Sequence, residues 1–261
     1  MNAPLFLSLG LGVQSTCLLH MAIAGEIEKP IAAVFADTGW ESRATYDALD
    51  EQSEVCKKAG IELIVCSGGN LRNDLLEAKE SGRFVSIPFH TENDGQSGMM
   101  RRQCTNDYKI KPVRNAIKAH LLKLGEKKSA RLQIGISWDE VHRMKPSGLN
   151  WLVHCWPLIE KRMSRANCLK WMAGKGLPAP ARSSCLGCPF HSNQEWRDLK
   201  EASPAEWQDT VMIDREIRKL PRLDGTVFLH RSCSPLDEAF LGIIEGQGDL
   251  FGNECEGMCG V

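Results

Sequence analysis

The chain has 261 residues, of which 43% are hydrophobic and 25% are charged, and its 32 basic and 33 acidic side chains give a formal net charge of −1. This length and composition are typical of a globular protein with one large domain, or one domain with an elaborated second half. They exclude a disordered or low-complexity chain.

The first 25 residues are mostly apolar, which is also typical of a secretion signal. However, no Lys or Arg precedes the apolar run, and glycines and polar residues interrupt it between Gly10 and Ser15. No other segment approaches the ~18 consecutive apolar residues of a membrane-spanning helix. We therefore expect a cytoplasmic protein without membrane contact.

Four apolar, β-branched runs predict strands, and helical spacing of apolar residues predicts helices between the first three. The strands are expected over 4–9, 31–36, 61–66 and 132–137, and the helices over 14–27 and 41–60. This alternation predicts a Rossmann-like α/β fold, in which a parallel sheet carries helices on both faces. Ligands of such sheets bind beyond the carboxyl ends of the strands, which are here residues 8–15, 37–40 and 137–140.

The sequence changes character after residue 140. Ser164 is expected to cap a helix that ends at Gly174, and Ser203 with Glu206 predicts a capping box at the start of another helix. A cysteine-containing loop lies between them. We place a boundary near residue 145, with a nucleotide-binding α/β domain over 1–145 and a helical, metal-binding region over 146–261 packed on it.

The segment SLGLGVQST, residues 8–16, delivers glycines and hydroxyls from the first strand to a helix N-terminus. Backbone amides and the helix dipole at such a point suit a phosphate group. The segment has neither of the two commonest phosphate-binding motifs, GxxxxGK[ST] and GxGxxG, so a plain strand-to-helix turn remains the alternative. The candidate nucleotide-binding residues here are Ser8, Gly10, Leu11, Gly12, Gln14 and Ser15.

Eleven cysteines in a reducing compartment favour metal binding or redox chemistry for any cluster of them. Five fall on predicted helices or strands and are interpreted as buried apolar residues: Cys17, Cys56, Cys66, Cys155 and Cys168. The other six lie in loops or near the C-terminus: Cys104, Cys185, Cys188, Cys233, Cys255 and Cys259.

The sharpest local signal is CLGC, in which Cys185 and Cys188 flank a glycine-containing turn. Two thiols at this spacing can bind one metal centre, and a [4Fe–4S] cluster, a zinc site and a redox dithiol all fit the pattern. The basic residues around Cys104 would stabilise a thiolate, which is the form that binds metal. Since the chain has no second CxxC, the remaining ligands of a metal centre must come from elsewhere in the sequence.

Local charge is strongly polarised. Residues 101–131 hold ten basic and two acidic side chains, residues 161–182 hold six basic and none acidic, and the last 26 residues hold six acidic and none basic. The basic middle predicts an anion-binding surface, which would suit nucleic acid, although solvated helix faces also carry such runs. Nearby, Trp138, Trp151 and Trp156 could stack on a base or pack in the core. Residues 90–100 have the composition of a flexible lid.

Seven segments in chain order resemble the PP-loop superfamily of adenine nucleotide α-hydrolases, which have a fold of the HUP type, and more closely its phosphoadenosine phosphosulfate reductase-like branch. They are SLGLGVQSTCL from Ser8, FADTGWE from Phe35, CTNDYKIKPV from Cys104, GISWDEVHRM from Gly135, WPLIE from Trp156, CLGCPF from Cys185 and ECEGMCGV from Glu254. The usual form of the first is Ser-Gly-Gly-x-Asp-Ser. Gln14 stands where that form has Asp, and either Ser8 or Gly10 occupies its first position.

The resemblance implies ATP or a related adenine nucleotide as ligand. It places the backbone of Gly135 near adenine and Asp37 near the nucleotide or Mg²⁺. It also places Lys109 or Lys111 near phosphate and Arg143 near phosphate or substrate. It brings Cys104 to the CxxC pair in a [4Fe–4S] centre, with zinc as the alternative. The fourth ligand is left open among Cys233, Cys255, Cys259 and a free iron site. The tail cysteines, Cys255 and Cys259, would act as catalytic thiols.

Three functions follow from these patterns. The first is ATP cleavage between the α and β phosphates, which adenylates a substrate, expected to be nucleic acid, for sulfur transfer. The second is thiol-dependent reduction of adenylyl sulfate or its 3′-phosphorylated form to sulfite. The third is a non-catalytic nucleotide-binding partner protein with structural zinc. The first two need a sulfur or electron donor protein, and a homodimer remains open.

Overall fold

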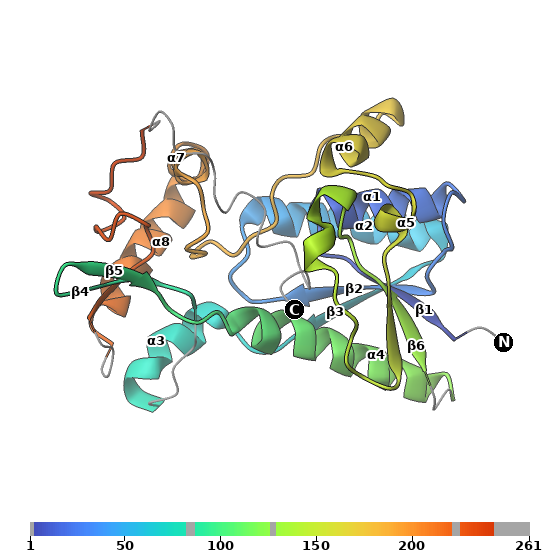
Figure 1. Cartoon of the computed structure of the whole chain (residues 1–261), viewed down its shortest axis with the longest axis horizontal. Helices are drawn as coiled ribbons and strands as arrows, with labels where there is room; N and C mark the ends of the chain where they lie inside the picture. The colour runs from blue at the N-terminus through green and yellow to red at the C-terminus, as the bar shows by residue number, and fades with distance from the viewer. Residues whose placement is uncertain (1–2, 82–86, 126–128, 221–224, 243–261) are drawn as a thin grey trace.

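The computed structural model describes residues 3–81, 87–125, 129–220 and 225–242, and its centre is a parallel sheet of five strands (Figure 1). The strands, in their order across the sheet, are β3 (Glu62–Ser67), β2 (Ala32–Asp37), β1 (Leu5–Ser8), β6 (Ala130–Gln133) and β7 (Leu152–Cys155). Phe6 of β1 pairs with Ala32 on one side and Leu132 on the other. The predicted Rossmann-like α/β fold is confirmed.

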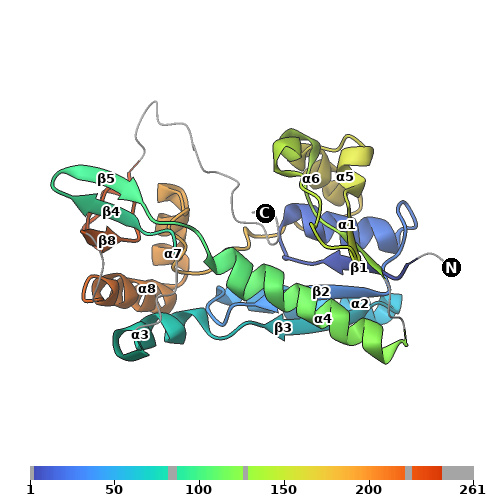
Figure 2. The same cartoon turned by 60° about the horizontal axis from the view of Figure 1, so that its bottom comes forward.

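Helices cover both faces of this sheet (Figures 1 and 2). One face carries α1 (Val13–Ile23), α2 (Arg43–Ala59), α5 (Pro157–Glu160) and α6 (Arg165–Gly174), and the other carries α4 (Lys111–Lys123). The alternation along β2 explains this, because Ala33 and Phe35 pack in the first cluster and Ala32 and Val34 in the second. Within the described ranges, no helix is long and apolar enough to cross a membrane.

A second lobe packs beside the sheet around its own core, which includes Trp196, Trp207 and Phe89. Its elements are α3 (Leu71–Ser81), β4 (His90–Asn93), β5 (Gln96–Met99), α7 (Asn193–Ala202), α8 (Pro204–Ile217) and β8 (Thr226–Phe228). The last strand pairs with β4 although more than 130 residues separate them in the chain. The boundary drawn near residue 145 therefore does not separate the two sheets, because β7 joins the first sheet and β4 and β5 join the second.

Residues 90–100, expected to be a flexible lid, form the β4–β5 hairpin instead. Asp94 and Gly95 have φ values of 49° and 78°, which is the left-handed pair of a tight hairpin turn. Asp-Gly between two short extended segments is the signal that the composition-based expectation missed.

Helix caps were predicted in part. Ser164 and Asn167 form a capping box at α6, as expected for the helix that ends at Gly174. The box expected between Ser203 and Glu206 does not form, because the Glu206 carboxylate instead accepts a hydrogen bond from the Arg43 backbone N–H at 2.6 Å. The α8 helix therefore begins without a side-chain cap and contacts the start of α2.

Candidate active site

The site begins at the point where strand order reverses. The chain runs from β1 outward to β3 on one side and returns through β6 to β7 on the other, so a ligand is expected beyond the carboxyl ends of β1 and β6. A Cβ added to Gly135 would lie 2.8 Å from the Ser15 backbone N. A glycine is required there because the loop after β6 touches the N-terminus of α1.

The loop after β1 reaches α1 through Leu11 and Gly12. Leu11 has a left-handed φ of 61°, and Gly12 is the N-cap residue of α1, where no side chain bonds to the first N–H groups. Left-handed backbone strongly favours glycine. If Gln14 and Ser15 fill the last two positions of Ser-Gly-Gly-x-Asp-Ser, Leu11 stands at the first Gly. This backbone geometry favours Gly10 rather than Ser8 as the first position.

The side chain of Gln14 is buried and engaged at both ends. Its Nε2 donates to Glu140 Oε2 at 3.0 Å, and its Oε1 accepts from Arg165 Nη1 at 2.9 Å. Arg143 Nη1 donates to the other oxygen of Glu140 at 2.5 Å. The amide thus joins α1 to α6 and to the short 3₁₀-helix η2 (Trp138–Arg143). The structure thus gives this side chain a connecting role, and its contact with nucleotide stays a prediction.

A pocket beside this loop, which we call the loop pocket, is walled by the ends of β1 and β2. Its lining residues are Ser8, Leu9, Gly10, Val34, Phe35, Ala36, Lys109, Val113 and Ser183. Two serines and one lysine are its polar groups. Lys109 comes from η1 (Asn106–Ile110), a π-helical turn that leads into α4. Single π-helical turns are frequent at functional sites, because they re-aim side chains locally.

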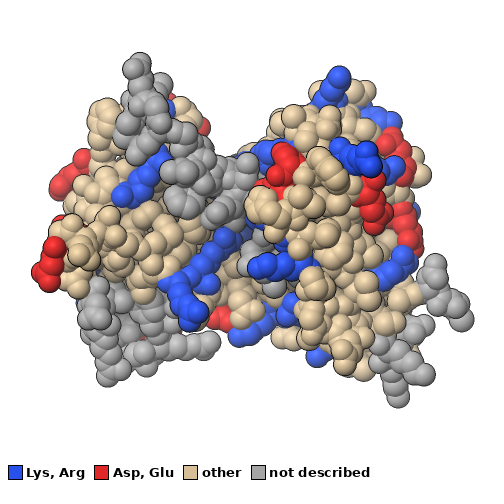
Figure 3. Space-filling model, viewed as in Figure 1, with Lys and Arg blue, Asp and Glu red and all other residues tan. Residues whose placement is uncertain are grey.

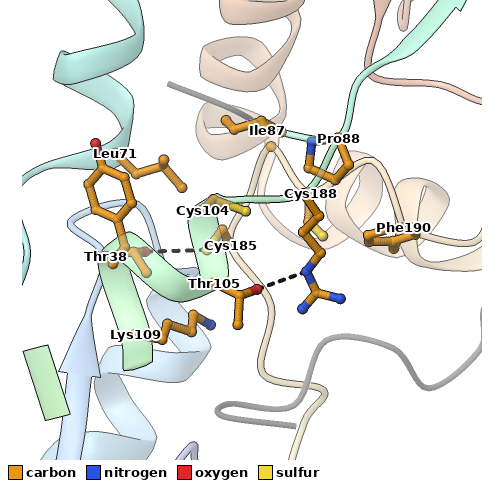
Figure 4. Close-up of a pocket in the computed structure, with 13 residues that line it drawn as sticks. Thr38, Leu71, Ile87, Pro88, Cys104, Thr105, Lys109, Cys185, Cys188 and Phe190 are labelled. Atoms are coloured by element: carbon orange, nitrogen blue, oxygen red, sulfur yellow. Dashed lines mark hydrogen bonds between the residues drawn. The ribbon is translucent and has the colours of Figure 1, made fainter. Parts of the chain in front are cut away.

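A second pocket, the thiol pocket, contains three cysteines from distant parts of the chain (Figure 4). It is lined by Thr38, Leu71, Ile87, Pro88, Arg102, Cys104, Thr105, Tyr108, Lys109, Cys185, Gly187, Cys188 and Phe190. Cys104 lies just before η1, and the CxxC pair lies in the loop between α6 and α7. The structure thus brings Cys104, Cys185 and Cys188 to one cavity. Lys109 lines this pocket as well as the loop pocket.

The turn that holds the CxxC pair packs against Trp40. Cys188 N donates to Cys185 O at 3.0 Å, and Leu186 N donates to Trp40 O at 2.9 Å. A Cβ on Gly187 would lie 2.0 Å from the Trp40 ring. The glycine between the two thiols is therefore needed to admit the indole as well as to form the turn.

Glu41 is a site residue that the sequence analysis did not single out. Its buried carboxylate accepts from Thr38 Oγ1 at 2.9 Å and lies 3.5 Å from Lys109 Nζ, and Cys185 Sγ donates to it at 3.6 Å. Removing both charges of an ion pair from water is costly unless further polar contacts compensate. The only signal in the sequence was an acid directly after the FADTGW turn.

Comparison with known proteins identifies the N-terminal part of the chain. Residues 4–125 match the model of the phosphoadenosine phosphosulfate reductase domain. This segment, somewhat less than half of the chain, is similar to that domain. The match confirms the predicted superfamily branch, whose members are enzymes. The matched residues include the loop after β1, Glu41, Cys104 and Lys109.

Other comparisons add little. A comparison with curated proteins found no match. Among solved structures, the U34-tRNA thiolase NcsA from Methanococcus maripaludis with its [4Fe-4S] cluster is similar over 83% of this chain and 72% of that chain, at 13% sequence identity and a TM-score of 0.42. This likeness is too distant to assign a property to the chain.

Asp37 of the reductase-family domain forms the turn after β2. Its Oδ1 accepts from Gly39 N at 2.7 Å and from the Tyr46 hydroxyl at 3.0 Å. Burial, and then the neighbouring Asp37 carboxylate, raise the pKa of Tyr46 well above its usual value, so this phenol stays a hydrogen-bond donor. The turn accounts for this oxygen of Asp37, while contact with nucleotide or Mg²⁺ stays a prediction.

Of the other three predicted thiols, only Cys233 lies within the described residues, and it is not in the thiol pocket. Cys233 Sγ donates to Thr91 O at 3.6 Å in the second lobe and is not among the lining residues. Cys255 and Cys259 lie outside the described residues. Among the residues that the structure describes, no three or more Cys, His, Asp or Glu side chains are grouped closely enough to hold a metal ion.

Proposed function

We propose that this protein is a PP-loop nucleotide enzyme that cleaves ATP between the α and β phosphates, adenylates a nucleic-acid substrate and admits sulfur in place of the adenylate. The observation that carries the proposal is the position of Lys109, which lines both the loop pocket and the thiol pocket. A phosphate contacted by this ammonium would lie between the nucleotide loop and the thiols.

The loop after β1 supports the nucleotide part of the proposal. The first backbone N–H groups of an α-helix lack partners within the helix, and the dipole adds partial positive charge at the same end. At α1 no side chain caps these groups, since Gly12 is the capping residue. They can therefore hold the phosphates of ATP, with the Lys109 ammonium on the side of the thiol pocket.

The residues of the thiol pocket fit an iron–sulfur centre in their chemistry. Cys104, Cys185 and Cys188 would supply three thiolates, the ligand type that such clusters use, and the wall around them is mostly apolar. The three side chains are not grouped closely enough in the structure, so binding requires them to reorient. When bound, a [4Fe–4S] centre with three protein ligands would offer a site for sulfur, whereas zinc would be structural.

The reaction balances in two steps. A substrate oxygen attacks the α-phosphorus, the bond to the bridging oxygen breaks and pyrophosphate leaves with the electron pair. Sulfide, delivered by the donor protein, then attacks the adenylated carbon, so a carbon–sulfur bond forms as the carbon–oxygen bond breaks and AMP leaves with the electron pair. Lys109 and the α1 amides would stabilise the charge that develops on the phosphate oxygens, and positioning would supply much of the remaining acceleration.

The charge of the surface supports an anionic substrate. Figure 3 shows Lys and Arg side chains gathered along the hollow between the two lobes on this face of the molecule. A positive cleft raises the local concentration of an anionic substrate and speeds its association. A nucleic acid is large enough to span both lobes.

The test measures pyrophosphate release from ATP by anaerobically prepared full-length protein. Lys109→Met should lower the rate by about 100-fold or more, as expected for losing one group that stabilises transition-state charge. Lys111→Met is the matched control, because Lys111 is exposed and pairs with Asp107 outside both pockets. Wild-type protein that releases no pyrophosphate with any nucleic acid would overturn ATP cleavage.

The metal part is tested by elemental analysis. Cys185→Ala and Cys188→Ala should each lose the metal, while Cys66→Ala, at a half-buried thiol in β3, should keep it. Iron with sulfide supports the cluster, and zinc supports the structural alternative. A single variant that keeps a full complement of metal would show that the site lies elsewhere.

Reduction of adenylyl sulfate, or of its 3′-phosphorylated form, is the second candidate, favoured by the family that matches residues 4–125. In this reaction a thiolate attacks the sulfur of the substrate, the adenosine phosphate leaves, and a second thiol releases sulfite. Sulfite formation with a dithiol reductant, in the absence of pyrophosphate release from ATP, would favour this candidate over the first.

A further inference from the structure

Trp138 is exposed at the start of η2, the short helix that follows β6. The chain has seven tryptophans, all within the described ranges. Trp138, whose side chain is 46% exposed, is the one tryptophan of the seven that is classed as exposed. Trp196 and Trp207, by contrast, lie in the core of the second lobe. Val141 and Met144, three and six residues further on, are also exposed. Single exposed apolar residues are ordinary, but a large aromatic ring beside a candidate site needs an explanation.

The ring is carried by a firmly anchored segment. Trp138 N donates to Met163 O at 2.8 Å, and the neighbouring Ser137 is fully buried. Glu140, two residues further on, is fixed by Gln14 and Arg143. The indole is therefore attached to a backbone segment that is already ordered. Less conformational entropy is then lost when a ligand binds.

The charge around the ring is positive on balance. The Arg162 guanidinium lies 5.9 Å from the Trp138 ring centroid. The acids nearby are engaged: Asp139 accepts from Arg165 N at 3.1 Å, and Glu140 pairs with Arg143. The neighbouring segment contains Lys161, Arg162 and Arg165 with no acidic side chain between them, so this edge complements a polyanion.

We propose that Trp138 and Arg162 form a stacking site for one unpaired base of a single-stranded nucleic acid. The proposal rests on the nucleic-acid substrate of the proposed function and specifies its strandedness. An aromatic face needs a base whose own face is open, which a duplex interior does not offer, while the guanidinium can contact the adjacent phosphate. Val141 and Met144 would contact the apolar edge of the same nucleotide.

The experiment measures binding of a fluorescently labelled single strand of about 12 nucleotides, a length within the usual site sizes, to the full chain without ATP. Trp138→Ala should weaken binding by about 5- to 100-fold, which is the range for loss of one stacked base. Trp138→Phe should retain most of the affinity, because it keeps an aromatic face. Arg162→Ala should weaken binding and lower the salt slope by about one.

The controls separate stacking from folding and from general charge. Leu122→Ala removes another exposed apolar side chain, on α4, and should leave binding unchanged. A duplex of the same sequence should bind wild type and Trp138→Ala equally. Equal single-strand affinity of wild type and Trp138→Ala, or failure of Trp138→Phe to restore binding in a folded variant, would overturn the proposal.

Failure of the stacking site can be distinguished from failure of the proposed ATP cleavage. Pyrophosphate release from ATP without any binding of single strands would overturn the stacking site and leave ATP cleavage standing. Trp138-dependent binding of single strands without pyrophosphate release would support the stacking site and overturn the proposed reaction.

Discussion

Leu11 shows how a single residue reports on the nucleotide loop. A left-handed conformation costs a non-glycine residue roughly 1–2 kcal/mol, yet Leu11 adopts it with a φ of 61° while its side chain is buried in the cluster under α1. Burial of the side chain offsets the backbone strain. The loop therefore keeps the shape of a glycine-rich turn with a leucine in a position that favours glycine.

This balance predicts an unusual order of stability. Leu11→Gly loses the buried side chain but relieves the strain, whereas Leu11→Ala loses the side chain and keeps the strain. Both variants should be less stable than wild type by a few kcal/mol, with Leu11→Ala lower than Leu11→Gly by about 1 kcal/mol. Urea unfolding at equilibrium measures both, and an alanine variant more stable than the glycine variant would contradict the assigned conformation.

Gly187 provides the second prediction at this scale. Because a Cβ would lie 2.0 Å from the Trp40 ring, Gly187→Ala must displace either the indole or the CxxC turn. We expect a loss of about 1–3 kcal/mol of stability, as for an overpacked core, together with reduced metal content. Gly174→Ala is the matched control, since nothing lies within 4 Å of its added Cβ. Thermal unfolding and metal analysis of the two variants decide it, and equal behaviour would count against this packing.

At the scale of elements, the sequence predicted the strands and helix starts that a local pattern of residues determines. Alternating apolar runs located β1, β2 and β3, and Ser164 located the start of α6. The strand expected over 132–137 is instead β6 over Ala130–Gln133, because the residues after it turn toward α1 and η2. The α7 helix, capped by Ser192 and Glu195, was missed because it follows directly on the cysteine loop.

The elements of the second lobe predict a dependence on pH. Burial, followed by the charges of Arg231 and His90, lowers the pKa of His230 to about 4. The ring nitrogens lie 2.7 Å from Ser232 Oγ and 3.1 Å from Asn193 Oδ1, so the neutral ring links β8 to the start of α7. Since the unfolded chain binds this proton near pH 6.5, its contribution is complete above that pH and falls as the pH decreases toward 4.

The expected loss between pH 7 and pH 5 is about 2 kcal/mol of the free energy of unfolding from this group. His230→Asn should lower stability at pH 7 and flatten the slope over this interval. His142→Asn, at an exposed position in η2, should leave the slope as in wild type. Urea titrations at several pH values test this, and an unchanged slope in His230→Asn would refute a buried neutral imidazole.

At the scale of the whole molecule, the candidate site required contacts that no local pattern encodes. The CxxC motif and Cys104 were recognisable in the sequence, and the structure brings them to one pocket. Glu41 was not recognisable, because its importance comes from Lys109 and Cys185, which lie far away in the chain. The sheet of the second lobe was missed for the same reason, since its strands β4 and β8 lie far apart in the chain.

Asp209 of α8 joins the second lobe to the turn after β2. Its carboxylate accepts from both Nε and Nη2 of Arg72 in α3 and from Trp40 Nε1 at 3.2 Å. Trp40 in turn packs on Gly187 between the pocket cysteines. The ion pair is therefore connected to the thiol pocket by one aromatic side chain.

Asp209→Ala should consequently affect two properties at once. Leaving Arg72 and Trp40 without this acceptor should cost about 2–3 kcal/mol of stability, and metal content should fall because the indole no longer supports the turn. Asp198→Ala, which removes an exposed acid of α7 bonded to Gln194, is the control and should change neither. If Asp209→Ala loses stability but keeps its metal, and hydrogen exchange at residues 185–190 is unchanged, then Trp40 does not transmit the contact, and the two lobes hold the pocket through their apolar packing alone.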